Sequence, residues 1–382
     1  MHQGAKELEA VCLVDATSGG RSCCAHVRCG EGTPRALSRA SRLLPEILTA
    51  LQILGRGNCL DINQLSSMSK SMAAATFHKF CKNFAKEMFE EHIYLPTGTY
   101  QDEVMDCYRK LGFTGAIGST DFTHVGWGMC PFTLGRSFTG KEGFPTLAFE
   151  VTVDHAGRAM GVTQGFTGAI NDKTIVRYDA AVQTIRNKVY KDREFKLRKA
   201  DGTEFTRKGC YLTVENGCHE WVTLTAPSKY PGDVDDAAFS KMLESVRKDV
   251  ECFVGMKGRF RILKLRLAFH YRKDIDNIFF TCGILHNMLH SFDGMSAFKE
   301  NVDWAGSAGL HDPKDHAPDT DCTSVGPRPA TDPEEYLFSP QHAKLKGQLI
   351  EIFSYRKKTM TLSGSLGPSR VEVIWMMPKC CE

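Results

Sequence analysis

The order of strand-like and helix-like segments in the middle of the chain limits the fold more than any other feature of the sequence. Apolar, β-branched runs come first, a helical pattern follows, and a short strand precedes a long helical segment. The expected strands are 116–127, two within 146–166, a hairpin over 193–209 and 211–215, and the expected helices are 172–190 and 237–264, the latter interrupted or bent near Gly255 and Gly258. This order predicts an α/β fold, a mixed sheet with helices on both faces.

A helical pattern occupies the segment before the sheet. Residues 43–54 carry an apolar face, 62–70 form a short second element, and 72–92 are expected to form a third helix capped by Ser71. Two short helices followed by a longer one fit a helix-turn-helix, and a plain helical bundle fits equally well. In a helix-turn-helix the side chains placed to contact DNA are Thr76, His78 and Lys79.

The chain has 382 residues, enough for more than one folding unit. We divide it into a poorly ordered N-terminus at 1–36, a helix-turn-helix-like region at 37–111, an α/β domain at 112–295, an acidic linker rich in Pro and Gly at 296–339, and a C-terminal helix and tail at 340–382. The linker has the composition of a segment that does not bury a core of its own.

Composition and charge narrow the classes of function. The net charge is only +3, so DNA binding would have to come from local basic clusters. Fifteen cysteines without an apolar leader indicate reduced thiols and a cytosolic or nuclear protein. The most apolar stretch, 278–289, is too short to span a bilayer and contains His286 and Asn287, so we expect a core helix and no membrane partner.

Three carboxylates stand apart from ordinary surface charges. Asp121 interrupts one β-like run, Glu215 ends another just before an Asn-Gly turn, and Glu251 lies among apolar residues of the helix expected over 237–264. Converging carboxylates are the ligands that Mg²⁺ or Mn²⁺ prefers, and two such ions about 3.5–4 Å apart assist phosphodiester displacement. On spacing alone the alternative stays open that these acids pair with basic neighbours such as Arg247 and Lys248.

Basic residues lie beside these acids in the sequence. Lys257, Arg261 and Lys264 recur at i, i+4 and i+7, the spacing of one helical face, with Arg259 between them. Their position after Glu251 favours contacts with DNA phosphates. A second cluster flanks the predicted hairpin and comprises Lys191, Arg193, Lys196, Arg198, Lys199, Arg207 and Lys208. For this second cluster, a solvated charged hairpin is as good an interpretation as a DNA contact.

Six stretches resemble, in the same order, the transposases of the PIF/Harbinger group, which includes the harbinger-derived nucleases. They are GSTDFTHVGW, GRSFTGKEGFPTLAFEVTVDHAGR, TQGFTGAINDKTIVRYD, YLTVENGCHEW, LESVRKDVECFVGMKGRFRILK and FFTCGILHNMLH. They cover about residues 112–295, and the helical region 41–93 matches the helix-turn-helix of the family. The resemblance implies a retroviral-integrase-like, RNase H-like fold with a DDE triad that binds two metal ions.

Carried over residue by residue, the resemblance makes Asp121 the first acid of the triad and Glu251 the last. Asp172 of GAINDK matches a further family acid, although helix capping explains it equally well. Glu215 stands where the family pattern VDNGYH has Asp, and Cys218 stands where it has Tyr. The extra methylene of Glu moves the carboxylate by about 1.5 Å. The strict octahedral geometry of Mg²⁺ tolerates such a shift poorly, so we expect a weakened site.

The expected protein is therefore a nuclear DDE-type DNA endonuclease or transposase that hydrolyses phosphodiesters and transfers strands with Mg²⁺ or Mn²⁺ in a two-metal site. Its expected partners are DNA, a second copy of the chain and an accessory DNA-binding protein. The alternative is a transposase-derived DNA-binding protein that has lost catalysis.

Overall fold

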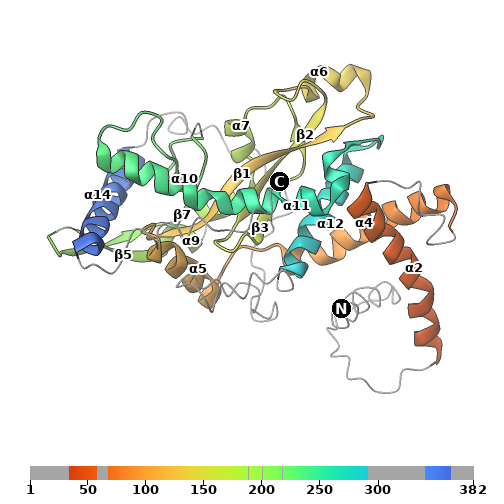
Figure 1. The fold of residues 1–382 in the computed structure, drawn as a ribbon, viewed down its shortest axis with the longest axis horizontal. Helices are drawn as coiled ribbons and strands as arrows, with labels where there is room; N and C mark the ends of the chain where they lie inside the picture. Colours follow the sequence, from red (N-terminus) through yellow and green to blue (C-terminus); the bar gives the residue numbers. More distant parts are fainter. Residues whose placement is uncertain are drawn as a thin grey trace.

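A computed structural model describes residues 34–57, 68–187, 189–199, 201–216, 218–290 and 340–362. Within these residues a seven-stranded mixed sheet forms the centre of the molecule (Figure 1). Its middle strand β1 (Ala116–Trp127) is antiparallel to β2 (Thr146–Val153) on one side and parallel to β7 (Tyr211–Thr213) on the other. The other strands of the sheet are β3 (Ala159–Val162) and β4 (Phe166–Thr167) beside β2, β8 (Leu224–Thr225) beside β7, and β9 (Arg266–Leu267) beside the end of β1.

The remaining elements cover or extend this sheet. A separate hairpin is formed by β5 (Glu194–Arg198) and β6 (Glu204–Lys208), as the sequence predicts. The helices before β2 are α2 (Pro34–Arg56), α4 (Lys70–His92), α5 (Gly98–Lys110), the 3₁₀ turn η2 (Phe132–Leu134) and α6 (Gly135–Phe138). Those after it are α7 (Asp172–Val176), α8 (Ala180–Asn187), α9 (Val189–Asp192), α10 (Val234–Val254), α11 (Met256–Arg259), η3 (Arg261–Lys264), α12 (Arg272–Leu289) and α14 (Pro340–Leu362).

One face of the sheet packs on α10 and α12, and α4 packs on α12. Residues paired across β1 and β2, such as Thr123 and Phe149, point to the same face. Phe149 stacks on Phe279 of α12 with ring centroids 4.0 Å apart, and both belong to a core that includes Val250 of α10 and Phe77 of α4. The sheet and these helices are therefore joined by one hydrophobic core.

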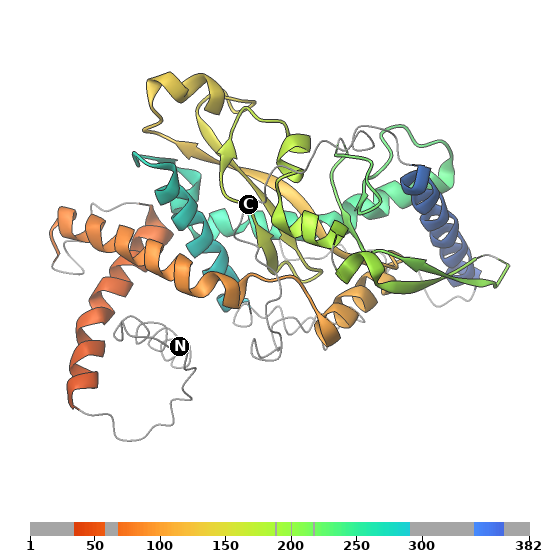
Figure 2. The ribbon, with the colours of Figure 1, turned by 180° about the vertical axis from the view of Figure 1, so that it is seen from behind.

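The opposite face of the sheet packs on α8 (Figure 2). Gly161 of β3 permits this contact, since a Cβ atom there would lie 2.6 Å from the Cβ of Ala181. Helices thus lie on both faces of a mixed sheet, and the predicted α/β class is confirmed at this level.

The predicted helix over 172–190 is not continuous. The chain forms α7, α8 and α9 instead, because Asp179 caps a new helix by accepting hydrogen bonds from the N–H groups of Ala181 and Val182. A single helical face through Lys257, Arg261 and Lys264 is also wrong. α10 ends at Val254, and the short α11 and the 3₁₀ turn η3 follow.

The region before the sheet differs in detail from the predicted helix-turn-helix. α2 is as long as α4, at 23 residues each, so the first helix is not short. Ser69, not Ser71, caps α4, since its side chain accepts a hydrogen bond from Met72 N–H. Most of the predicted second element lies outside the described residues, as do the proposed N-terminal and acidic linker segments. The helix-turn-helix stays a prediction.

Two further helices complete the described part. α5 was not expected from the sequence, and its buried Tyr100 and Tyr108 pack beside the start of β1. α14, expected as a terminal helix, docks on α10 through Leu345 and Leu349. Among the described helices, none has the length and apolar character that crossing a membrane requires.

Candidate active site

Asp121 lies at the centre of the candidate site, on the face of β1 that packs against α10. Its side chain is 17% exposed. Oδ1 accepts a hydrogen bond of 2.8 Å from the N–H of Phe122, and Oδ2 accepts one of 2.7 Å from Nη1 of Arg247. Both carboxylate oxygens are therefore engaged, and they hold the side chain toward α10.

Arg247 joins Asp121 to Glu251. It lies one turn before Glu251 on α10, so both side chains project from the same side of the helix. Nη2 of Arg247 is 3.5 Å from Oε1 of Glu251. The guanidinium is 13% exposed, whereas the Glu251 side chain is 53% exposed. The two acids thus face the same point, and the pairing with Arg247 that the sequence left open is confirmed.

Glu215 is delivered by β7, the strand beside β1. It lies two residues beyond the end of β7, and its side chain is exposed. The loop that follows is fixed by aromatic contacts. The ring of His219 stacks on Trp221 at 4.7 Å, with Nε2 2.8 Å from the carbonyl oxygen of Lys173, and the guanidinium of Arg186 lies 4.1 Å from the Trp221 ring. Glu215 is therefore exposed at the start of a well-packed loop.

Several acids act on the thiol of Cys218, which lies in the loop after β7. Its pKa is raised to about 12, first by burial and then by the negative charges of Glu150, Asp172, Glu215 and Asp121. Each of these four carboxylates therefore acts on the thiol in the loop after β7. Even so, no three His, Cys, Asp or Glu side chains in the described part of the chain are grouped closely enough to hold a metal ion.

Asp172 is the first residue of α7. The helix is capped by the preceding residue, Asn171, whose side-chain oxygen accepts a hydrogen bond of 2.9 Å from Lys173 N–H. Capping by the Asp172 side chain is therefore not the reason for an acid at this position. Its charge also acts on Glu150 and His124.

A second acid pair, which the sequence did not predict, lies on the opposite face of β1 and β2. Glu150 is fully buried, and its Oε1 accepts a hydrogen bond of 3.2 Å from Thr120. Asp179 uses Oδ1 to cap α8. None of the described N–H or O–H groups donates to the remaining oxygens, Glu150 Oε2 and Asp179 Oδ2. The charge of Asp179 acts on Glu150, and we expect a proton shared by the two carboxyl groups to satisfy both oxygens.

The pKa values of this buried pair follow from its surroundings. Burial, together with the charge of Asp179, raises the pKa of Glu150 well above its usual range. Burial also raises the pKa of Asp179 to about 6. One signal in the sequence could have revealed the pair, because Glu150 is the only polar ionisable residue within the apolar run TLAFEVTV.

The basic segment after Glu251 has one buried member and several exposed ones. Nζ of Lys257 donates a hydrogen bond of 2.7 Å to the carbonyl oxygen of His124 on β1, and burial lowers the pKa of this lysine to about 8. Lys257 therefore ties α11 to the sheet. The exposed basic side chains are Arg259, Arg261, Lys264 and Arg266.

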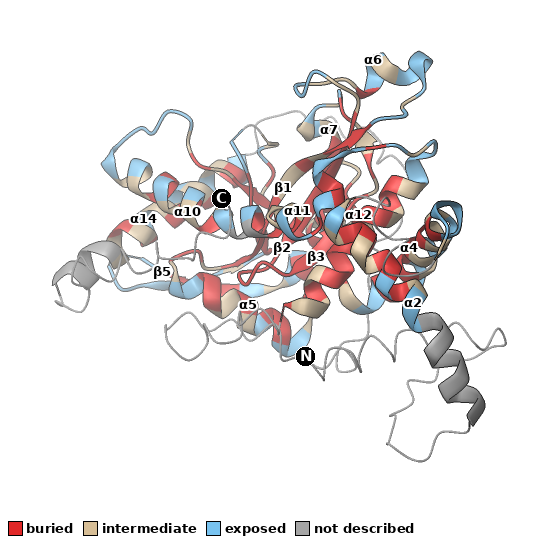
Figure 3. Ribbon diagram, turned by 45° about the vertical axis from the view of Figure 1, so that its right-hand side comes forward, coloured by how far each residue is buried: buried red, intermediate tan, exposed pale blue. Residues whose placement is uncertain are grey.

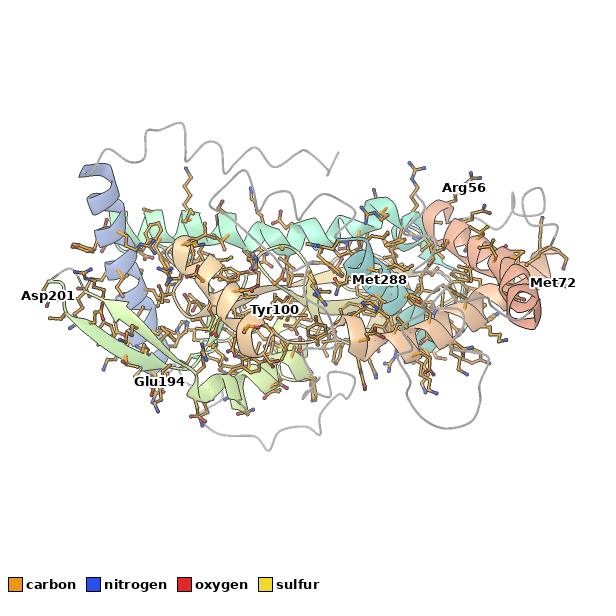
Figure 4. The ribbon with its side chains drawn as sticks, turned by 90° about the horizontal axis from the view of Figure 1, so that it is seen from below. Arg56, Met72, Tyr100, Glu194, Asp201 and Met288 are labelled. Atoms are coloured by element: carbon orange, nitrogen blue, oxygen red, sulfur yellow. The ribbon has the colours of Figure 1, made fainter. Side chains whose placement is uncertain are left out.

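The basic hairpin has different neighbours. Arg193 pairs with Asp102, Lys208 pairs with Glu194, and Arg207 binds Gln348 of α14. Figure 4 shows the hairpin tip at Asp201 at one end of the molecule, with Arg56 and Met72 at the other. Three of the seven basic side chains thus stabilise the fold, which favours the interpretation as a charged structural hairpin.

The predicted contacts of the helix-turn-helix lie on α4. Lys79 is exposed and Thr76 is half-buried. His78 packs edge-on against Phe269 with ring centroids 4.7 Å apart, and its Nδ1 lies 3.9 Å from Asp274. His78 therefore contacts the segment that leads into α12.

The comparisons with known proteins give one match. Residues 92–294, just over half of the chain, match a family model described as plant transposon protein. No curated protein and no solved structure matches the chain. The matched range contains Asp121, Glu215 and Glu251, together with the whole seven-stranded sheet.

Proposed function

The chain belongs to the plant transposon protein family, and from this premise we propose that it is a transposase-derived DNA endonuclease or transposase of the PIF/Harbinger type. In this proposal the mixed sheet is an RNase H-like catalytic fold, and Asp121, Glu215 and Glu251 form its acidic triad. The reaction is hydrolysis of a phosphodiester followed by strand transfer. The protein works in the nucleus on DNA, as a homo-oligomer and with an accessory DNA-binding protein.

One observation carries this proposal. Asp121, on the central strand, and Glu251, on a helix that is 130 residues further along the chain, both contact Arg247. Arg247 and Glu251 are four residues apart on α10, so it is the contact of Arg247 with Asp121, on a strand distant in the sequence, that brings the two acids together. The arrangement supports a cation site formed between β1 and α10.

The donor chemistry suits a divalent cation. Carboxylate oxygens are the ligands that Mg²⁺ and Mn²⁺ prefer, and Asp121, Glu251 and Glu215 would hold them. At rest, the guanidinium of Arg247 takes the position between Asp121 and Glu251. For metal to enter, Arg247 must turn away from the two acids, and a DNA phosphate is its natural new partner. When bound, the metal ions would activate water and stabilise the attacked phosphate.

Glu215 weakens the site in this proposal. Its carboxylate lies about 1.5 Å further from the backbone than that of the Asp in the family pattern. Mn²⁺ accepts irregular oxygen geometry more readily than Mg²⁺, so residual cleavage should be stronger with Mn²⁺.

A second candidate function is DNA binding without catalysis. The observations that favour it are the ion pairs of Arg247 with both acids and the lack of a three-ligand group among the described residues. If Arg247 keeps its position when metal is added, the chain binds DNA and does not cut it.

Nicking of supercoiled DNA in Mn²⁺ separates the two functions. We expect weak nicking by the unchanged protein, faster nicking by Glu215→Asp, and none by Asp121→Ala or Glu251→Ala. All four proteins are first matched for thermal stability. If Glu215→Asp leaves activity at zero, the binding-protein function takes over. If the unchanged protein already cuts as fast as Glu215→Asp, the site is not weakened.

The DNA path is tested by charge reversal with a matched control. Arg261→Glu with Lys264→Glu should weaken DNA binding for all sequences and reduce the slope of log affinity against log salt by about 2, because two phosphate contacts are lost. The control is Lys196→Glu with Arg198→Glu, two exposed residues of the hairpin. Equal losses of DNA affinity in the two double variants would mean that the bound DNA contacts both basic clusters.

A further inference from the structure

The connection between β1 and β2 ends in an exposed apolar tip. We call residues 128–145 the β1–β2 tip; it contains η2 and α6. Phe132 is 100% exposed, and Leu134 and Met129 are 42% and 41% exposed. Figure 3 shows α6 standing beyond the buried sheet, with mostly exposed residues. The tip therefore presents three large apolar side chains to solvent in one short segment.

The tip has its own apolar anchor, so Phe132 is not needed to fold it. Phe138 is buried and packs edge-on against Trp127 with ring centroids 4.9 Å apart. Nε1 of Trp127 donates a hydrogen bond of 2.7 Å to the carbonyl oxygen of Phe269, and Gly128 N–H donates one of 2.7 Å to Leu267. The buried Phe138 thus holds the tip to the sheet, while Phe132 remains exposed to solvent.

Basic residues lie in and next to the tip, together with one exposed acid, Glu142. Arg136 and Lys141 belong to the tip and are exposed. At its base, the guanidinium of Arg266 lies 4.0 Å from the ring of Phe144. The exposed Arg261 and Lys264 come just before the same strand, β9. An exposed aromatic residue with mainly basic neighbours suits duplex DNA, which has negative phosphates outside and stacked aromatic bases inside.

The tip also lies in line with the candidate site. β1 runs from Asp121 to Trp127 and then enters the tip. Six residues of strand span about 20 Å, which equals about six base pairs of duplex. A duplex that follows β1 from Asp121 would therefore meet the tip about half a helical turn from the phosphate at the acids.

We infer that Phe132 is a DNA wedge, which enters the base stack about half a helical turn from the cleavage site while Arg136, Lys141 and Arg266 contact the flanking phosphates. This inference rests on the proposed action on DNA. Apolar side chains inserted between base steps unstack and bend a duplex, and a bent duplex contacts more of the protein surface. The wedge would give the enzyme a preference for flexible steps such as TA, even without contacts to base edges.

The test uses the full chain and duplexes that carry 2-aminopurine at successive positions. Binding should raise the fluorescence at a few adjacent positions, because unstacking relieves quenching. Phe132→Ala should remove this rise and lower DNA affinity by about tenfold, whereas Phe132→Trp should keep both. Tyr230→Ala is the matched control, since Tyr230 is an 83% exposed aromatic residue outside the tip.

The outcomes distinguish the wedge from the proposed function. An unchanged fluorescence rise and affinity in Phe132→Ala overturn the wedge and leave the DNA function standing. Failure of the unchanged protein to bind any duplex at low salt overturns both. If Phe132→Ala changes only sedimentation, by abolishing self-association, the tip binds a second copy of the chain and the wedge is wrong.

Discussion

Two pairs of acids lie on opposite faces of the same two strands, and they are neutralised in different ways. Asp121 and Glu251, the cation-bridged pair, share the guanidinium of Arg247. Glu150 and Asp179, which we call the proton-bridged pair, are expected to share a proton, because burial raises the pKa of both carboxyl groups. The Glu251 side chain is 53% exposed, whereas Glu150 is fully buried. Of the two pairs, only the cation-bridged pair is exposed enough for another cation to replace the guanidinium of Arg247.

This difference shows that burial, more than the identity of the residues, decides whether an acid pair keeps its negative charges. A buried pair without access to ions lowers its charge by keeping a proton. A pair at the surface keeps its charges and takes up a cation. The cation-bridged pair is therefore the one that suits metal binding, although the two pairs lie on opposite faces of the same sheet.

The largest effect is expected from removing the bridging cation. Arg247→Ala leaves Asp121 and Glu251 without their shared partner, and we expect the free energy of unfolding to fall by about 3 kcal/mol, as for other partly buried ion pairs. Added Mn²⁺ should restore much of this loss, since it binds the folded state. Thermal unfolding with and without Mn²⁺ measures both effects.

Lys248→Ala is the control for this variant, because Lys248 is the exposed neighbour of Arg247 on α10. Its stability should change by less than about 0.5 kcal/mol and should not respond to Mn²⁺. If Arg247→Ala is as stable as the unchanged protein, the guanidinium does not neutralise Asp121 and Glu251, and the contrast between the two acid pairs is wrong.

The next effect concerns the proton-bridged pair and pH. The pKa of Asp179 is about 6 in the folded protein and near 4 in an unfolded chain. Between these values the folded state holds a proton that the unfolded state has released. Asp179 alone should therefore lower the free energy of unfolding by about 2 kcal/mol as the pH rises from about 4 to about 6, and Glu150, whose pKa is raised as well, should add to this fall. Denaturant unfolding at several pH values measures this fall.

Glu150→Gln should remove the part of that fall that comes from Glu150. The new amide can donate a hydrogen bond to Asp179 without a titrating proton, so the variant should be more stable than the unchanged protein at pH 8 and similar to it near pH 4.5. Asp276, whose pKa burial also raises to about 6, is present in both proteins and cancels in the comparison. Parallel pH profiles for the two proteins would show that no proton is shared.

The smallest effect separates the two roles of Asp179. Asp179→Asn keeps an oxygen for the cap of α8 and should behave like Glu150→Gln. Asp179→Ala also removes the cap and should be less stable than Asp179→Asn by about 1 kcal/mol at every pH. Thermal unfolding at pH 5 and pH 8 distinguishes them. Equal stability of the two variants would mean that Asp179 does not cap α8.

Much of the cation-bridged pair could be predicted from the sequence. Asp121 interrupts a β-like run, and Glu251 and Arg247 are four residues apart on a helical pattern, so local periodicity gives their elements and spacing. The strands 116–127 and 146–153 and the hairpin were predicted for the same reason. That Arg247 reaches Asp121 depends on how α10 packs on β1.

The proton-bridged pair was missed because its geometry is entirely tertiary. Glu150 lies in a run that alternation alone assigns to a buried strand, and Asp179 lies inside a pattern that suggests one continuous helix. The break before α8 depends on capping by Asp179. The break after α10 was predicted from Gly255 and Gly258, whereas the position of Lys257 depends on packing, since Lys257 binds the carbonyl oxygen of His124.

Binding of Mn²⁺, followed by electron paramagnetic resonance, tests most directly the claim that the cation-bridged pair is a metal site. We predict that the unchanged protein binds Mn²⁺, that Asp121→Asn weakens binding at least about tenfold, and that Arg247→Ala strengthens it, because the competing guanidinium is gone. Glu150→Gln should leave Mn²⁺ affinity unchanged. Equal Mn²⁺ affinity of Asp121→Asn and the unchanged protein, or a loss of binding in Glu150→Gln, would contradict the account.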